Sequence, residues 1–190
     1  MLLMVGLGNP GVQYANNRHN IGFRILDAIQ AEYKFPAYIS KFQGAYATGR
    51  LADQNIALLK PMTYMNLSGK SVSECIRFYK IPVENVYVFY DEIDLVLGKV
   101  KVKIGGSAAG HNGIKSLDQY IEKEYTRVRF GVDRPVGGQP VSSYVLQDFA
   151  SFEKNDVQDL IHILVDELPR LVAGDKERFM SEIARRQQTK

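Results

Sequence analysis

The hydrophobic positions of the chain follow two kinds of pattern, and each kind predicts one type of element. Short apolar runs at 2–7 and 86–90 are typical of fully buried strands. Residues 44–51 and 55–59 predict two paired strands joined by the polar turn 52–54. From Ile21 to Tyr33 the apolar residues recur at helical spacing and define one buried face. Further helices are predicted at 68–79, from 111 to about 123, at 153–173 and at 175–186.

Cationic residues alternate with apolar ones in two other stretches. A period of two at 99–104 places Lys99, Lys101 and Lys103 on one face of a strand, and Arg127 and Arg129 repeat the pattern on the next strand. The glycine-rich turn 105–110 follows the first of these strands. Two cationic strand faces beside such a turn suit a phosphate-binding surface. The alternation fits solvated outer faces equally well, so both interpretations stay open.

The composition narrows the class of protein. With 190 residues, of which 45% are hydrophobic and 24% charged, the chain resembles an ordinary globular domain, and a net charge of +3 does not identify a nucleic-acid binder. The single cysteine, Cys75, excludes an internal disulfide. No apolar run approaches the length of a membrane span, and the N-terminal segment lacks the features of a signal peptide. We therefore expect a cytoplasmic location.

The stretch from Tyr14 to Gly22 holds the strongest candidate for chemistry. It carries His19, one of three histidines, among amide side chains just before the first predicted helix. Asn16 or Asn17 suits the N-cap, which would place His19 in the first turn, where the helix dipole favours the neutral ring. A neutral histidine is suited to proton transfer near neutral pH. An ordinary capping segment with a surface histidine fits the same residues.

Two further motifs suggest ligand contacts. Residues 6–11 match G-x-G-x-x-G, but no helix follows directly and the chain about 20 residues further on is predicted helical, so a dinucleotide site is weakly supported. The glycines suit a tight turn that brings Asn9 close to a ligand. Asp91, Glu92 and Asp94 follow the strand at 86–90, where a carboxylate faces the ligand side of an open α/β sheet. No histidine or further acid at ligand spacing supports a metal site.

Taken together, these segments resemble the bacterial peptidyl-tRNA hydrolase family. Several separated motifs in the same order are more specific than any one of them, and here they span most of the chain: 6–11, 14 with 18–22, 60–69, 91–95, 105–106 with 110–113, and 127–131. The departures are Asn17 in place of a common threonine, Ala109 in place of a common glycine, and Asp133 at a position that is often small or apolar. Only Ala109 is close to the expected site, where its methyl group could narrow the approach to His111.

The expected fold is a single α/β domain over residues 1–190. We expect a mixed twisted sheet with helices on both faces, and loops at the strand ends that form a crevice. The resemblance implies hydrolysis of the ester between a peptide, or an N-blocked aminoacyl group, and the 3′ ribose of tRNA. It implies no cofactor and no metal ion, and a monomer that binds the acceptor stem and the 3′ end of peptidyl-tRNA.

The resemblance also implies roles for individual residues. His19 is expected to be the general base that activates water, and Asp91 the acceptor of its other ring N–H. The positions that match substrate- and tRNA-binding residues of the family are Asn9, Tyr14, Tyr64, Asn66, Asn112, Lys103 and Arg129, with Met65 and His111 in supporting places. His111 keeps two interpretations: it supports Asn112 and shapes the site, which we favour, or it acts in proton transfer.

Two other functions stay open. A non-catalytic RNA-binding relative would keep the basic faces without hydrolysis, and the intact set of His19, Asp91, Asn66 and Asn112 argues against it. A dinucleotide-dependent oxidoreductase would rest on the glycine loop alone.

Overall fold

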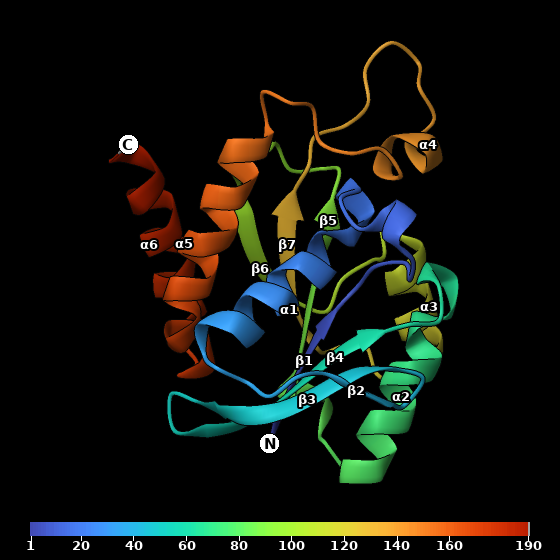
Figure 1. The fold of residues 1–190 in the computed structure, drawn as a ribbon, viewed down its shortest axis with the longest axis vertical. Coiled ribbons are helices and arrows are strands. Elements are labelled where there is room, and N and C mark those ends of the chain that lie inside the picture. The colour runs from blue at the N-terminus through green and yellow to red at the C-terminus, as the bar shows by residue number, and fades with distance from the viewer. Residues whose placement is uncertain (190) are drawn as a thin grey trace.

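The computed structural model of the protein describes residues 1–189. Seven strands form one mixed sheet through the middle of the molecule (Figure 1). Their spatial order is β2-β3-β4-β1-β5-β7-β6. Strands β4, β1, β5 and β7 run parallel, whereas β2–β3–β4 and β6–β7 pair antiparallel. The strands are β1 (Leu2–Gly6), β2 (Ile39–Lys41), β3 (Gly44–Leu51), β4 (Gln54–Pro61), β5 (Val86–Glu92), β6 (Val100–Ile104) and β7 (Thr126–Gly131).

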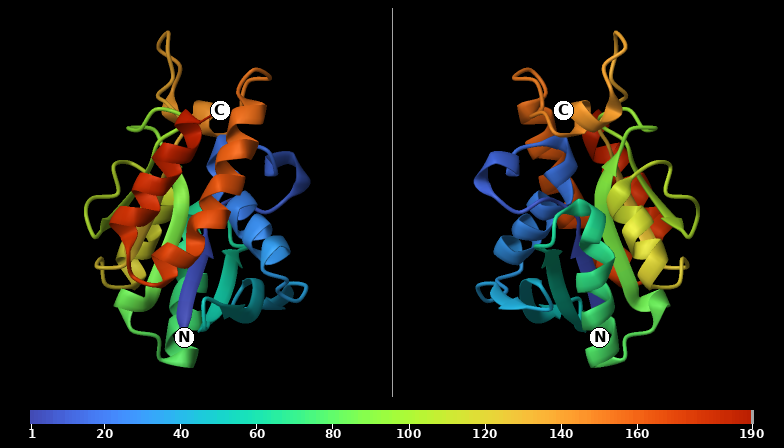
Figure 2. Two further views of the ribbon diagram at one scale, coloured as in Figure 1. Left: turned by 90° about the vertical axis from the view of Figure 1, so that its left-hand side faces the viewer. Right: turned by 90° about the vertical axis from the view of Figure 1, so that its right-hand side faces the viewer.

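Helices cover both faces of this sheet (Figure 2), and each face has its own apolar core. Helices α1 (Ile21–Glu32), α5 (Lys154–Val172) and α6 (Lys176–Gln188) pack on one side, and α2 (Ser68–Tyr79) and α3 (Asn112–Tyr120) pack on the other. The short helix α4 (Val141–Val145) lies beyond the end of the sheet. No helix within residues 1–189 has the length and apolar content needed to cross a membrane. The predicted α/β fold with a mixed sheet is confirmed.

The carboxyl ends of the parallel strands meet at one edge of the sheet. Strand β1 ends at Gly6, β4 at Pro61, β5 at Glu92 and β7 at Gly131. Loops that leave this edge of an open α/β sheet form the usual ligand-binding crevice. Most of the polar motifs found in the sequence lie in or beside these loops, whereas the glycine-rich turn after Ile104 leaves the opposite edge, where β6 pairs with the start of β7.

Two glycines allow α1 to approach the sheet closely. A Cβ atom on Gly22, in the first turn of α1, would lie 2.3 Å from the carbonyl oxygen of Phe89 in β5. A Cβ atom on Gly6 would lie 2.3 Å from the carbonyl oxygen of Gly22. Since no larger side chain fits at either position, the turn that precedes α1 is held directly over the end of β5.

The main differences from the sequence prediction are at the element boundaries. Helix α1 starts at Ile21, and His19 lies in a separate 3-10 turn (η2, Arg18–Asn20) that precedes it. The predicted N-cap was wrong, because the Asn17 side chain bonds Asp148 and the N-cap position of α1 falls on Asn20. Strand β2 and helix α4 were not predicted; with three and five residues, they are too short to show a period.

Candidate active site

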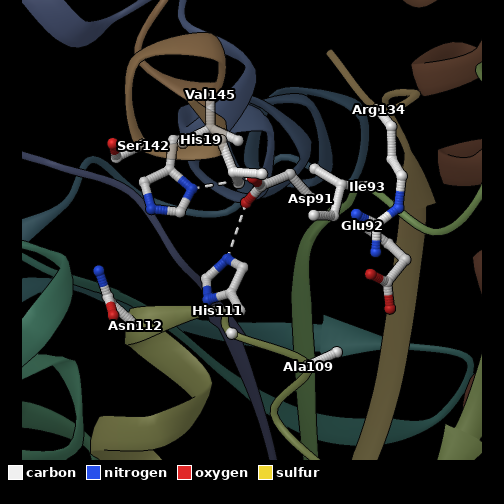
Figure 3. Close-up of a pocket in the computed structure, with 12 residues that line it drawn as sticks. His19, Asp91, Glu92, Ile93, Ala109, His111, Asn112, Arg134, Ser142 and Val145 are labelled. Carbon is white, nitrogen blue, oxygen red and sulfur yellow. Dashed lines mark hydrogen bonds and ion pairs between the residues drawn. The ribbon is translucent and has the colours of Figure 1, made fainter. Parts of the chain in front are cut away.

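The loops at the carboxyl edge enclose a cleft made of two adjoining cavities. Both are lined by His19, Asn112, Ser142 and Val145, so the cavities meet at these residues. The first, of about 350 Å³, is called the Asp91 cavity here (Figure 3), and its other lining residues are Asp91, Glu92, Ile93, Ala109, Gly110, His111, Arg134 and Val141. The second, of about 440 Å³, is called the Asn9 cavity, and its other lining residues are Asn9, Tyr14, Tyr64, Met65, Asn66 and Leu146.

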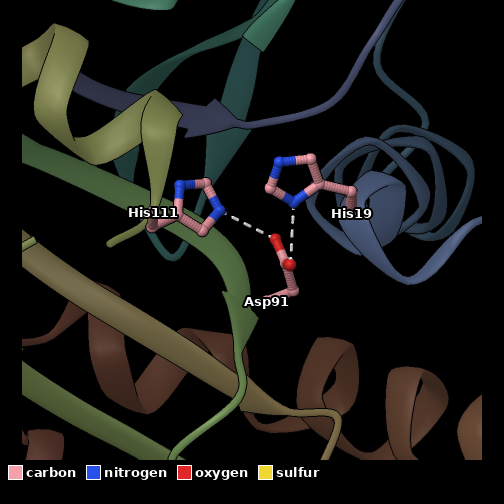
Figure 4. Close-up of side chains that lie close together, drawn as sticks. All are labelled: His19, Asp91 and His111. Atoms are coloured by element: carbon pink, nitrogen blue, oxygen red, sulfur yellow. Dashed lines mark hydrogen bonds and ion pairs between the residues drawn. The ribbon is translucent and has the colours of Figure 1, made fainter. Parts of the chain in front are cut away.

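A buried carboxylate at the end of β5 lies between two histidine rings (Figure 4). The Oδ2 atom of Asp91 is 2.8 Å from Nδ1 of His19, and its Oδ1 atom is 2.8 Å from Nε2 of His111. The ring centroids of the two histidines are 4.7 Å apart. All three side chains are at most 9% exposed. The structure thus joins His19 and Asp91, which lie 72 residues apart in sequence.

The hydrogen bonds of His111 determine which ring nitrogens carry protons. His111 is the N-cap of α3, and its Nδ1 atom accepts the backbone N–H groups of Gly113 and Ile114 at 3.1 and 3.3 Å. An accepting Nδ1 carries no proton, so Nε2 is the nitrogen that donates to Asp91. Asp91 accepts from His19 Nδ1–H in the same way, which leaves Nε2 of His19 unprotonated. Figure 3 shows Asn112 on the side of the His19 ring that is turned away from Asp91.

Burial and charge act in opposite directions on the titration of these groups. Burial disfavours the imidazolium of His19, but the charge and hydrogen bond of Asp91 outweigh it and raise the pKa of His19 above 6.5. Burial also disfavours the Asp91 carboxylate, yet the two histidines hold the pKa of Asp91 below its usual value. Burial dominates at His111, whose pKa is lowered. Asp91 is therefore ionised and His111 is neutral, and His19 takes up a proton more readily than a free histidine does.

The same three residues contain the donor types of a two-histidine, one-carboxylate metal site, with donor atoms within 4.8 Å of one another. Their hydrogen bonding does not suit a metal ion. Nε2 of His111 carries a proton because Nδ1 caps α3, so a metal bond at Nε2 would need an imidazolate or the loss of the cap. The hydrogen bonds of these three residues therefore suit bound protons and not a metal ion.

Amide side chains line the Asn9 cavity in two different ways. Asn9 is fixed: its backbone N–H and carbonyl bond the side chain of Asn20, and its Oδ1 atom accepts the N–H of Met65 at 2.7 Å. These bonds leave the Nδ2 group of Asn9 as a donor toward the cavity. Asn66 and Asn112 are exposed, and within residues 1–189 their side chains have no hydrogen-bond partner.

The aromatic residues predicted from the resemblance come together at the same cavity. The rings of Tyr14 and Tyr64 pack edge to face, with centroids 6.5 Å apart. Tyr64 is 54% exposed, and its backbone has φ 62° and ψ 156°, a region that favours glycine. Met65, which follows it, is buried, and a Cβ atom on Gly113 would lie 2.5 Å from its sulfur. Met65 therefore packs between the two loops that carry the amides.

The cationic strand faces differ from the prediction at one residue. In the β6–β7 register Lys101 pairs with Arg129 and Lys103 with Arg127, so all four side chains share one face. Arg127 is not part of an open surface, because it is 1% exposed and bonds Asp118 and the carbonyl of Ser107. Arg129 is half-buried beside Glu92 at 3.7 Å, and Lys103 is exposed. The predicted phosphate surface is reduced to the lysines and Arg129.

Comparison with known proteins shows to which family the chain belongs. A model of the family described as peptidyl-tRNA hydrolase matches residues 3–190. The chain belongs to this family. A peptidyl-tRNA hydrolase from Dinoroseobacter shibae is 50% identical over 98% of this chain and 79% of its own length. One from Novosphingobium aromaticivorans is 47% identical over 100% of this chain and 99% of its own length.

A solved structure supports the same assignment. The crystal structure of peptidyl-tRNA hydrolase from Acinetobacter baumannii superposes with a TM-score of 0.90 at 34% identity, covering 97% of this chain and 94% of the other. The family resemblance inferred from the sequence motifs is therefore confirmed. Ala109 is the departure from the family pattern that lies nearest the site. Its backbone has φ 47°, in the left-handed region that favours glycine, and this explains why glycine is common at this position in the family.

Sequence reasoning did not single out three residues that shape the site in this member of the family. Ser142 and Val145 of α4 line both cavities, and Asn20 fixes Asn9. Nothing in the local pattern of residues 141–145 connects them with His19, since the contact depends on the tertiary fold. Asn20 lies inside the family motif at 18–22, so its position was a signal that could have been used.

Proposed function

We propose that this chain hydrolyses peptidyl-tRNA, releasing free tRNA and the peptide, with His19 as the general base. The observation that supports this most is the His19–Asp91 pair, which leaves Nε2 of His19 free in a cleft lined by amide side chains. The family assignment supports the substrate class.

In the first step, water attacks the ester carbonyl carbon while Nε2 of His19 takes its proton. The charge that develops on the imidazolium is stabilised by Asp91, which also keeps the N–H on Nδ1. In the second step the tetrahedral intermediate collapses, and the bond to the 3′ oxygen of the ribose breaks. His19 returns its proton to that oxygen, so the products are a 3′ hydroxyl and a peptide carboxylic acid that ionises in water.

The amide groups supply the donors that the intermediate needs. Asn66 and Asn112 line the Asn9 cavity without partners, so either can donate to the carbonyl oxygen as it becomes negative. Asn9 Nδ2 is available to a carbonyl of the peptide, because Oδ1 is occupied by Met65. We assign Asn9 to recognition of the peptide and the other two to the ester and the attacking water.

His111 acts through Asp91 in this mechanism. Its Nδ1 atom is committed to the cap of α3, so it neither receives nor passes on a proton without breaking that cap. Its Nε2–H group holds the second oxygen of Asp91 and thereby orients the first toward His19. We therefore assign His111 a positioning role, in agreement with the interpretation favoured from the sequence.

The tRNA moiety is expected along the outer parts of the cleft. Tyr64, which is exposed, and Tyr14, which is partly buried, offer rings on which a base or ribose of the 3′ end can stack. We assign Lys103 and Arg129 to the 5′-phosphate, because a terminal phosphate carries more charge than an internal one and forms strong charge-assisted bonds. We further propose a cytoplasmic monomer, since one chain supplies every residue named here.

A non-catalytic RNA-binding protein is the alternative, and one variant separates the two functions. His19→Ala should lose hydrolysis of N-acetyl-aminoacyl-tRNA while keeping its affinity for tRNA and its melting temperature, because general-base catalysis contributes about 10² to 10⁴ in rate. A variant that keeps most of its activity would remove His19 from the mechanism. A wild-type protein that binds tRNA without releasing the acyl group would favour the binding function.

A further inference from the structure

Arg18, the residue before His19, is a buried cation that the proposed mechanism does not use. It is 6% exposed, and its Nε atom is buried without a partner. A buried charge is strongly disfavoured unless other groups compensate for it. The groups that compensate Arg18 all belong to one distant segment, 144–153.

Six contacts join Arg18 to that segment, one of them with the Phe149 ring, whose centre lies 5.6 Å from the guanidinium carbon. Its Nη1 group donates to the carbonyl oxygens of Tyr144 and Gln147 at 3.1 and 3.4 Å, and Nη2 lies 3.5 Å from Oε1 of Glu153. The guanidinium carbon lies 3.9 Å from the centre of the Tyr144 ring. The backbone N–H of Arg18 also donates to Gln147, at 3.0 Å. We call this set of contacts the Arg18 tether.

The tether fixes one end of α4, the helix that forms a wall of the cleft through Ser142 and Val145. Tyr144 belongs to α4, and Gln147 lies two residues beyond the last residue of this helix. The other end of α4 continues into the loop 133–140, where Val136 is 87% exposed and two glycines have positive φ. The wall residues Ser142 and Val145 are therefore attached to the body of the protein mainly at the carboxyl end of α4.

We propose that Arg18 is a positioning residue that holds α4 against the His19 turn, so that the wall carrying Ser142 and Val145 has a fixed place relative to the base. This inference extends the proposed function and rests on it for its kinetic consequences. His19 itself is held by Asp91, so loss of the tether should weaken substrate binding and leave the chemical step unchanged. A charged donor such as Arg18 forms hydrogen bonds stronger than those between neutral groups.

The test uses Arg18→Met and Arg18→Lys, with Arg186→Met as the matched control. Arg186 is also partly buried and basic, but its side chain bonds Asp166 and Glu167 of α5 and not the α4 segment. Amide hydrogen exchange at 141–148 should become about tenfold faster or more in both Arg18 variants, with exchange in β1 and β5 unchanged. The KM for N-acetyl-aminoacyl-tRNA should rise about tenfold, with kcat and the acid limb of the pH profile preserved. Arg186→Met should change neither measurement.

Unchanged exchange at 141–148 together with an unchanged KM would overturn the proposal. Exchange that accelerates equally throughout the chain would also overturn it, because Arg18 would then stabilise the whole fold. If the Arg18 variants do not fold, Tyr144→Leu removes the ring from the other side, and it must show the same local exchange and KM changes. Tyr144→Phe is its control, because it loses only the hydroxyl bond to the carbonyl of Val132 and keeps the ring, so it must not show them. The exchange measurements need no activity, so failure of the tether is distinguishable from failure of the proposed hydrolysis.

Discussion

Replacing Asp91 by asparagine tests the proton arrangement of the site. The amide presents one oxygen and one NH₂ group where Asp91 presents two oxygens. Because Nδ1 of His111 is occupied by the cap of α3, its Nε2–H must still donate, so the amide oxygen turns toward His111. The NH₂ group then faces Nδ1 of His19, which becomes an acceptor, and the His19 proton moves to Nε2. The base is lost although every side chain stays in place.

The size of the effect follows from the step that is removed. General-base catalysis contributes about 10² to 10⁴ in rate, and a wrong tautomer in a serine-protease triad costs about 10⁴ in kcat. We therefore expect Asp91→Asn to lower kcat by about 10² to 10⁴, equivalent to about 3–5 kcal/mol in the barrier. The KM should change little, because Asp91 is buried behind the histidines.

A second substitution should partly reverse the loss. His111→Asn keeps a good N-cap residue for α3 but is too short to donate to position 91. In the double variant with Asp91→Asn, the amide is free to turn its oxygen to His19 and restore the N–H on Nδ1. Single-turnover release of N-acetyl-aminoacyl groups from tRNA should thus be faster in the double variant than in Asp91→Asn alone. An Asp91→Asn protein with near-normal kcat, or a double variant slower than both single ones, would refute this reasoning.

Three further predictions follow from the same geometry. Since hydrolysis needs neutral His19 and its pKa is raised, kcat/KM should fall as the pH decreases, with a midpoint above 6.5, and a flat profile between pH 6 and 8 would contradict this. Lys103→Ala and Arg129→Ala should each weaken activity on tRNA that carries its 5′-phosphate and have little effect on tRNA that lacks it. If removal of the phosphate lowers the activity of the variants as much as that of the wild type, the two residues do not bind this phosphate. Asn20→Ala should raise KM about thirtyfold for N-acetyl-aminoacyl-tRNA, because the two lost hydrogen bonds to Asn9 contribute about 1 kcal/mol each. An unchanged KM would show that Met65 alone fixes Asn9.

The elements that can be predicted from the sequence are those whose pattern is local. Helix α2 was predicted with its observed bounds, Ser68–Tyr79, because its apolar face repeats over three turns. Asp91 and Glu92, the last residues of β5, were recognised as ligand-side residues from their place at a strand end. His19 was a candidate from its own stretch, and the family motifs favoured it over a surface histidine and added Asn66 and Asn112, which periodicity alone does not distinguish from surface residues.

The rest depends on contacts between distant residues. The period-two pattern treats Arg127 and Arg129 alike, yet only Arg127 is buried, because α3 brings Asp118 against it. The tautomer of His111 depends on two backbone N–H groups of α3 and on Asp91, none of which a sequence pattern specifies. The Arg18 tether likewise joins residues more than 120 positions apart.

A comparison of the wild type with His19→Ala tests whether His19 catalyses hydrolysis of peptidyl-tRNA. Purified wild type and His19→Ala are each incubated with N-acetyl-aminoacyl-tRNA labelled in the acyl group, and release of the label and of deacylated tRNA is followed. We expect rapid release of both by the wild type, and release slower by about 10² or more by the variant, which still binds tRNA. Equal rates for the two proteins, or no release by the folded wild type, would contradict it.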